Sequence, residues 1–233
     1  MSKLYVAGDS FATLSKIQPM GISWSELLAK ELNFDLINIS KVGASNESIC
    51  IQLDYIVEKI SKNDRVVCFL TDSFRKTLAF SDKDLSNKHL LAYHSLHEDQ
   101  NHIGDLEFQN EFYIESYTHL NCKKSKDAEF YFKSFYNYTY QKWLDVNLIT
   151  GVVAKLKSIT DNFLICSGGF DDSVYIDEPY CVTHNTFLIN EKNFLNLSSS
   201  KILKMANDPN TCNHITLLGH QKIFRLLLNS VAG

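Results

Sequence analysis

Short apolar runs alternate with stretches of helical periodicity in the amino-terminal third of the chain. Three runs, Leu4–Ala7, Phe34–Ile39 and Arg65–Leu70, have the length and the residue types of strands. Between them, Trp24–Leu32 and Ser48–Ile60 carry apolar residues at the spacing of one helix face. Strands that alternate with helices are typical of a parallel sheet covered by helices.

The alternation stops after the third run. From Arg75 to about Asn121 the chain is polar, contains several histidines and shows little periodicity. We interpret about residues 75–140 as an insertion between strands 3 and 4 of the predicted sheet.

Periodicity returns in the second half of the chain. Ala128–Ile159 predicts a long helix with a break near Gly151, Asn162–Gly168 predicts a fourth strand, and Gly219–Ser230 predicts a final helix with one apolar face. We therefore expect a single α/β domain over residues 1–233, with a parallel sheet between two layers of helices.

Aromatic residues concentrate in and just beyond the insertion. The segment from Phe108 to Trp143 holds 12 of the 28 aromatic residues in the chain. We expect a cap of packed rings over the sheet, and the alternative is an aromatic wall that binds substrate.

Composition narrows the classes of function. The chain has 23 basic and 27 acidic residues, a net charge of −4, so we expect no nucleic-acid partner. No apolar run approaches the length of a membrane span, and no secretion signal is recognisable at the first residues, which predicts a cytoplasmic protein. The six cysteines form no CxxC pair, and we interpret them as free thiols.

Three short polar motifs follow predicted strands or precede the last helix. Gly8-Asp9-Ser10 ends the first strand, where a serine hydroxyl would face the ligand-binding crevice of a parallel sheet. Gly43 is followed by Ser45 and Asn46 between the second strand and the second helix. Each motif taken alone also fits ordinary turn and helix-cap chemistry.

The third motif is His214-Ile-Thr-Leu-Leu-Gly-His220, just before the final helix. A serine hydroxyl needs a neighbouring base to act as a nucleophile near neutral pH, and histidine is the usual one. His214 is the candidate base, whereas His220 at the helix start is interpreted as structural.

Together, and in this order, the three motifs resemble those of the SGNH hydrolases, the GDSL-type esterases and lipases. The resemblance covers roughly residues 3–75 and 160–230 and leaves out the middle of the chain. It implies a three-layer flavodoxin-like fold and a serine esterase that cleaves a small acyl or O-acetyl ester, with a carbohydrate among the acceptors. Ser10 would be the nucleophile, His214 the base, and the backbone N–H groups of Ser10 and Gly43 the oxyanion hole.

Two positions depart from the family pattern. The aspartate expected shortly before the histidine is replaced by Thr211 and Cys212, so we name Asp208, six residues before His214, as the third catalytic residue. After the third strand, Asp72 stands where the family has an asparagine that donates to the oxyanion.

An ionised Asp72 would repel the oxyanion, so this position needs a second explanation. Either Asp72 turns away, towards Arg75, or Asn46 or Thr71 supplies the donor. We name Asn46 as the third member of the oxyanion hole.

Two rival functions remain. The chain is alternatively a non-catalytic binding or assembly protein on a degenerate hydrolase frame, which Asp72 and Thr211 favour. A flavodoxin-like domain that binds phosphate at residues 8–15 is the third reading. The histidines of the insertion, among them His94 and His97, lack the partners of a metal site, so we expect neither a metal nor another cofactor.

Overall fold

The structure of the protein is a computed structural model that describes residues 2–9, 11–12, 23–41, 44–71, 73, 75–81, 112–118, 123, 126–167, 193–196 and 217–231. Its strands are β1 (Lys3–Gly8), β2 (Asp35–Asn38), β3 (Arg65–Phe69), β4 (Arg75–Ser81), β5 (Phe112–Thr118), β6 (Phe163–Ser167) and β7 (Phe194–Asn196). Its helices are α1 (Trp24–Leu32), α2 (Asn46–Lys59), α4 (Lys126–Ser134), α5 (Tyr138–Ile159) and α9 (Leu217–Val231).

Five strands form one parallel sheet in the order β2-β1-β3-β6-β7. When the β4–β5 hairpin is set aside, this is the doubly wound order 2-1-3-4-5 of flavodoxin-like folds. The order reverses between β1 and β3, whose carboxyl ends pair at Gly8 and Phe69. Ligands of such sheets bind outside the strand ends at this switch point.

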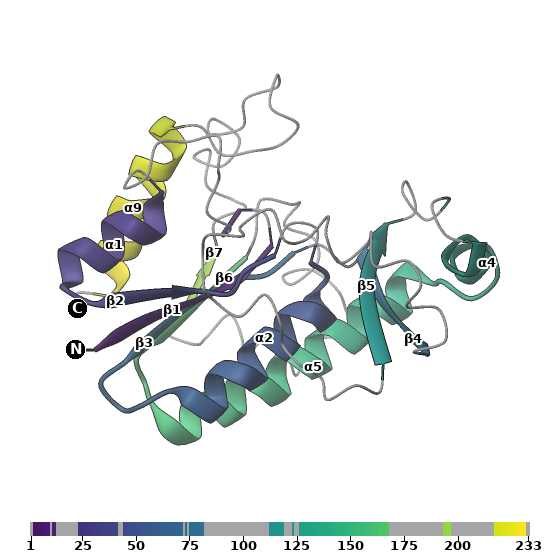
Figure 1. Ribbon diagram of the computed structural model, residues 1–233, viewed down its shortest axis with the longest axis horizontal. Helices are drawn as coiled ribbons and strands as arrows, with labels where there is room; N and C mark the ends of the chain where they lie inside the picture. Colours follow the sequence, from purple (N-terminus) through teal and green to yellow (C-terminus); the bar gives the residue numbers. More distant parts are fainter. Residues whose placement is uncertain are drawn as a thin grey trace.

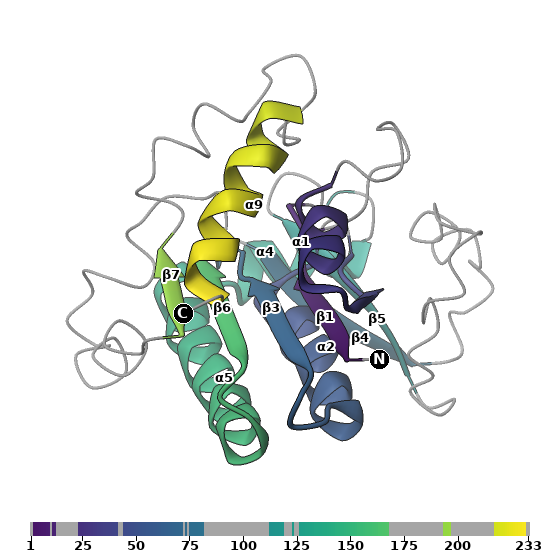
Figure 2. The same ribbon diagram turned by 90° about the vertical axis from the view of Figure 1, so that its left-hand side faces the viewer.

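The sheet lies between two helical layers (Figures 1 and 2). Helices α1 and α9 cover one face, and α2 and α5 cover the other. Side chains of β1 alternate between the two cores: Tyr5 and Ala7 pack towards α2 and α5, while Leu4 and Val6 pack towards α1 and α9. The predicted α/β fold with a parallel sheet between helices is therefore confirmed.

Several predicted boundaries are close to the observed ones. Helix α1 has the predicted bounds, and the four strands predicted from apolar runs are β1, β2, β3 and β6. The predicted break near Gly151 is wrong, because α4 and α5 are separated at residues 135–137. There the Asn137 side chain accepts the Tyr140 N–H and caps α5.

The first part of the insertion is more regular than its sequence indicates. Strands β4 and β5 form an antiparallel pair in register from Arg75 opposite Thr118 to Ser81 opposite Phe112. The irregular structure expected from Arg75 onwards is thus wrong for these two strands. The intervening histidines, including His94 and His97, lie outside the described residues.

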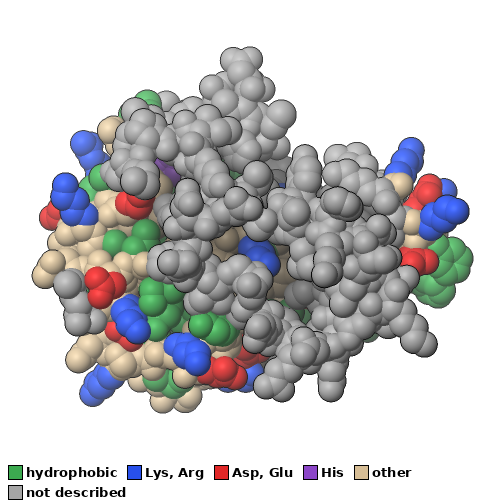
Figure 3. Space-filling view, in the orientation of Figure 1, with side chains coloured by type: hydrophobic (Ala, Val, Ile, Leu, Met, Phe, Trp, Pro, Cys, Tyr) green, Lys and Arg blue, Asp and Glu red, His purple; other side chains and the backbone are tan. Residues whose placement is uncertain are grey.

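The aromatic side chains of α4 do not cap the sheet. Phe132 is buried against Leu78 of the hairpin, in a small cluster separate from the two main cores. Phe130 and Phe135 are 61% and 66% exposed, and hydrophobic side chains stand beside charged ones at the α4 end of the molecule (Figure 3). The expected cap of rings is therefore wrong for α4, which packs on the hairpin beyond the sheet edge (Figure 1).

Three thiols lie among the described residues. Cys50, Cys68 and Cys166 are free and buried, as predicted, and the other three cysteines lie outside that part of the chain. In the described part of the chain, no helix is both long and apolar enough to cross a bilayer.

Helix α1 begins against α9. Its N-cap Ser23 forms a capping box with Glu26, and the N–H of Trp24 donates to Nδ1 of His220 at 3.2 Å. His220 thus satisfies one of the amide groups that a helix start leaves without an intrahelical acceptor. Burial lowers the pKa of His220 from 6.5 to about 4, although the Glu26 charge opposes the shift.

We predict that protonation of His220 destabilises the fold. The unfolded state takes up the proton first as the pH falls, so the contribution of His220 is complete above pH 6.5 and is lost between 6.5 and about 4. His220→Asn keeps an acceptor and removes the titration. In urea unfolding at a series of pH values, the wild type should lose about 1.4 kcal/mol per pH unit relative to this variant within that window. A difference that stays constant with pH would contradict this role.

The backbone at the end of β1 requires a glycine at position 8. Its φ is +146°, and an added Cβ would lie 2.8 Å from the Phe69 carbonyl oxygen and 2.9 Å from Cβ of Ala12. Only glycine fits this end of β1 without strain. Gly151, inside α5, is the opposite case, because an added Cβ there has no neighbour within 4 Å.

We predict opposite effects for alanine at these two glycines. Gly8→Ala should lower the free energy of unfolding by about 2–4 kcal/mol through backbone strain and steric contact. Gly151→Ala should raise it by about 0.5–1 kcal/mol, because alanine favours a helix interior. Urea unfolding curves of the two variants measure both changes, and equal stability of Gly8→Ala and the wild type would rule out the strained turn.

Candidate functional site

The end of β1 is fixed from α2. The buried side chain of Gln52 accepts the Gly8 N–H at 2.8 Å and donates to the Gly8 carbonyl at 3.3 Å. The same carbonyl accepts the Lys41 N–H at 3.0 Å, which joins the loop after β2 to the end of β1.

A tight turn follows Gly8. The Ala12 N–H donates to the Asp9 carbonyl at 3.0 Å, and the Phe11 N–H donates to Oδ1 of Asp9, also at 3.0 Å. Ser10 stands between these residues in the sequence and lies outside the described residues. Its two neighbours therefore fix the chain on either side of the candidate nucleophile.

Arg75 joins the loops after β1 and β2. Its Nη1 donates to Oδ2 of Asp9 at 3.1 Å and to the Ala44 carbonyl at 3.2 Å. The Asp9 side chain is fully buried and that of Arg75 is 12% exposed. Burial raises the pKa of Asp9, although the Arg75 charge and the Phe11 N–H oppose the shift.

The contacts of Arg75 concern two predictions: that the first two motifs lie at one sheet edge, and that Asp72 turns towards Arg75. Asp9 and Ala44 each adjoin a candidate site residue, Ser10 and Gly43, so one guanidinium spans the two motifs at the sheet edge. Gly43 and Asp72 lie outside the described residues. Among the described residues Arg75 forms its ion pair with Asp9, whereas one of our explanations directed Asp72 to it.

Asn46 is the one predicted oxyanion residue that the structure describes in full. It is fully buried at the start of α2, where Ser45 is the N-cap. Its Nδ2 donates to the Thr71 carbonyl and to Oδ2 of Asp145, both at 2.8 Å, and its Oδ1 accepts the Thr71 N–H at 2.9 Å. An asparagine amide has two hydrogens. Both have acceptors here, so this geometry does not fit the expected role as an oxyanion donor.

The sequence motifs do not include Asp145, which lies in α5. It accepts from Asn46, from Oγ of Ser73 at 2.7 Å and from Nε2 of Gln141 at 2.6 Å. Burial, the largest cause, raises the pKa of Asp145 to about 6 despite these three hydrogen bonds. The carboxylate therefore holds both neighbours of Asp72 in the chain, Ser73 directly and Thr71 through Asn46.

Trp24 connects the start of α9 to Phe11, in the turn after β1. Nε1 of Trp24 donates to the Phe11 carbonyl at 3.0 Å, while the backbone N–H of Trp24 binds His220. The Trp24 ring also stacks on Phe69 at a centroid distance of 4.9 Å. His220, which we interpreted as structural, has that role here. His214 and Asp208 precede it in the chain and lie outside the described residues.

Sequence reasoning missed Gln52 and Asp145, and it named Arg75 only as a partner of Asp72, whereas Arg75 binds Asp9. One signal was available: Gln52 and Asp145 are polar residues that interrupt the apolar faces of α2 and α5, beside Leu53 and Val146. A polar residue on a buried helix face needs a partner, and here the partners are the strand-end loops.

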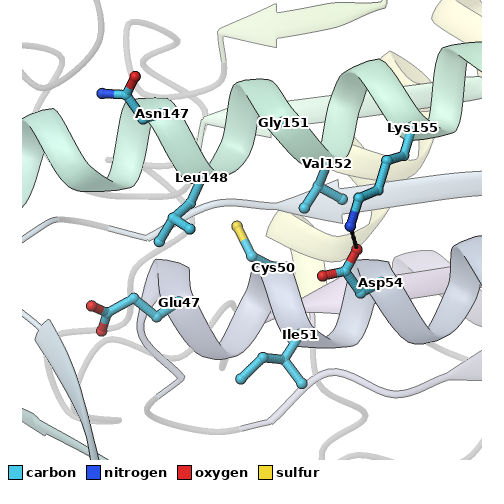
Figure 4. Close-up of a pocket in the computed structure, with 9 residues that line it drawn as sticks. All are labelled: Glu47, Cys50, Ile51, Asp54, Asn147, Leu148, Gly151, Val152 and Lys155. Carbon is cyan, nitrogen blue, oxygen red and sulfur yellow. Dashed lines mark hydrogen bonds and ion pairs between the residues drawn. The ribbon is translucent and has the colours of Figure 1, made fainter.

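A groove of about 370 Å³ lies elsewhere, between α2 and α5. Cys50 of α2 points towards Leu148 and Val152 of α5 there, and the Asp54–Lys155 ion pair lies at one end (Figure 4). Burial raises the pKa of the Cys50 thiol well above its usual value, which disfavours the reactive thiolate form. The groove runs along the helices and is not the strand-end site.

We compared the sequence and the structure with those of known proteins. No protein-family model matches the sequence, and no curated protein matches it. Among solved structures, TesA aligns over 98% of this chain and 97% of its own, with a TM-score of 0.51 and 11% identity.

Two other solved structures resemble the chain less closely by TM-score. A member of the lipolytic G-D-S-L family from Veillonella parvula has a TM-score of 0.48 at 10% identity, over 98% of this chain and 97% of its own. An acetyl xylan esterase from Butyrivibrio proteoclasticus has a TM-score of 0.49 at 11% identity, over 99% of this chain and 64% of its own. The chain has the three-layer flavodoxin-like fold of the SGNH hydrolases, which the resemblance of its three motifs predicts.

Proposed function

We propose that the protein is a serine ester hydrolase that cleaves a small acyl or O-acetyl ester. The observation that carries this proposal is the double contact of Arg75 with Asp9 and Ala44. It holds the flanks of Ser10 and Gly43 together at the switch point of the sheet, where a parallel α/β fold binds its ligands.

The position of α9 supports His214 as the base. Phe11 adjoins Ser10, and Trp24 connects Phe11 to His220 by two hydrogen bonds. His214 is six residues before His220, a separation that a short loop can span. We assign the nucleophile to Ser10 and the base to His214 on these contacts.

The reaction follows from these roles. Oγ of Ser10 attacks the ester carbonyl carbon while His214 takes the hydroxyl proton, and the C–O bond to the alcohol breaks as His214 returns that proton to the leaving oxygen. Water then attacks the acyl-enzyme with His214 again as base. The products are the free acid and the alcohol, and Ser10 is regenerated.

The tetrahedral intermediate needs hydrogen-bond donors. We assign this role to the backbone N–H groups of Ser10 and Gly43, and we give Asn46 a supporting role because its amide hydrogens are engaged. One donor fewer than the family pattern corresponds to about 2.7–4 kcal/mol of barrier. A slow or narrowly selective esterase is the expected outcome.

The first test is hydrolysis of a short-chain nitrophenyl ester. We predict that Ser10→Ala and His214→Ala each lower kcat/KM by about 10³-fold or more, because each removes a member of the catalytic unit. Ser158→Ala, which removes an exposed hydroxyl bonded to the Lys155 carbonyl, is the matched control and should retain wild-type activity.

Equal rates of the wild type and Ser10→Ala would remove the esterase proposal. They would leave the non-catalytic binding protein on a hydrolase frame, which Asp72 and Thr211 favour.

The second test concerns Asp208, which we propose as the residue that orients His214. Asp208→Asn should lower kcat by about 10⁴-fold if the carboxylate selects the catalytic tautomer. Steady-state kinetics with the same ester measure this. A variant within about threefold of the wild type would exclude Asp208 and assign the orienting role to another acceptor.

A further inference from the structure

We propose that Asp145 is a positioning residue of the catalytic edge, which holds the loop after β3 in place through Asn46 and Ser73. This inference rests on the proposed esterase function for its catalytic meaning. The contacts that carry it are all between described residues.

Three donors converge on one buried carboxylate. Oδ2 of Asp145 accepts from Nδ2 of Asn46 at 2.8 Å and from Oγ of Ser73 at 2.7 Å, and Oδ1 accepts from Gln141 at 2.6 Å. Asp145 is fully buried. An ionised carboxylate accepts hydrogen bonds and donates none, so it matches three donors in a way that an amide does not.

The network continues into the main chain of the loop. Asn46 pairs with both the N–H and the carbonyl of Thr71, in the manner of a neighbouring strand. Asp145 thereby fixes the residues before and after Asp72. This loop follows β3 at the switch point, which is where the proposed oxyanion site lies.

The same carboxylate is connected to the hairpin. Gln141 donates also to Oε1 of Glu47 at 3.2 Å, and Glu47 accepts the Thr77 N–H at 2.7 Å and pairs with Lys76. Lys76 and Thr77 follow Arg75 in β4. Asp145 is therefore linked through α2 to the strand that delivers Arg75 to Asp9.

A purely structural role explains this arrangement poorly. Within the described residues, Asp145 has no cationic partner among the ion pairs, and burial of an uncompensated carboxylate costs stability. The raised pKa of Asp145 is the mark of that cost. A buried carboxylate that destabilises the fold yet holds loops of a site is typical of a functional position.

The experiment compares Asp145→Asn with Ile149→Ala. Ile149 is buried one turn further along α5 and has an apolar side chain that takes no part in the hydrogen bonds of Asp145, so its variant controls for lost stability alone. We measure kcat and KM for a short-chain nitrophenyl ester and the hydrogen-exchange rate of the Thr71 amide. The kinetic constants and the exchange rate are measured at a temperature and pH at which all variants are folded.

The expected result is a selective loss in Asp145→Asn. Its kcat should fall about tenfold or more with KM changed less than about threefold, and the Thr71 amide should exchange about tenfold faster. Ile149→Ala should change neither. The double variant Ser73→Ala, Asp145→Asn should lose no more activity than Asp145→Asn, because both act through one contact.

The milder variant Ser73→Ala serves if Asp145→Asn does not fold. In Ser73→Ala, kcat should fall about threefold and the Thr71 amide should exchange about threefold faster. Unchanged kcat and unchanged Thr71 exchange in the folded variant would overturn the proposal.

Failure of the esterase function is distinguishable from failure of this inference. If the wild type hydrolyses no ester, the proposed function falls, and Thr71 exchange alone decides the positioning role. Faster exchange in Asp145→Asn but not in Ile149→Ala supports it, and equal exchange overturns it.

Discussion

The buried contact of Arg75 with Asp9 is the constraint on which the candidate site depends. The fully buried Asp9 carboxylate tolerates loss of its cationic partner poorly, since removal of that partner leaves an uncompensated buried charge at a typical cost of about 3–5 kcal/mol. The turn after β1, the loop after β2 and the first residue of β4 must therefore stay together. The hairpin is thus tied to the parallel sheet at the edge where β1 and β3 end, although it forms a separate two-stranded sheet.

The two helical layers support this edge in different ways. From the α2 and α5 side, polar side chains reach the strand-end loops, with Gln52 on Gly8 and the Asp145 network on the loop after β3. From the α1 and α9 side, Trp24 packs on Phe69 and connects the turn at Phe11 to the start of the last helix. The proposed hydrolase needs its hydroxyl, base and amide donors held with little freedom, and both layers restrain described residues, such as Gly8 and Phe11, that lie close to Ser10 in the sequence.

The sequence predicted the elements whose burial is regular and missed those held by distant polar contacts. Apolar runs marked β1, β2, β3 and β6, and helical periodicity gave the bounds of α1, because burial on a helix or sheet face leaves a local pattern. Strand β4 lacks such a run, since its first residues bind Asp9 and Glu47 rather than a core. For the candidate site, the short motifs after the predicted strands indicated which edge of the sheet to examine. Gln52 was not found and Arg75 was named only as a partner of Asp72, because their observed partners lie 44 and 66 residues away and no spacing rule connects them.

The central claim is that Ser10 is an activated nucleophile beside His214. Reaction with a fluorophosphonate, followed by peptide mass spectrometry, tests it most directly, since the reagent bonds to a serine whose proton a neighbouring base removes. The account predicts one adduct, on Ser10, that forms far more slowly in His214→Ala. An adduct on another serine, no adduct at all, or an equal rate without His214 would contradict it.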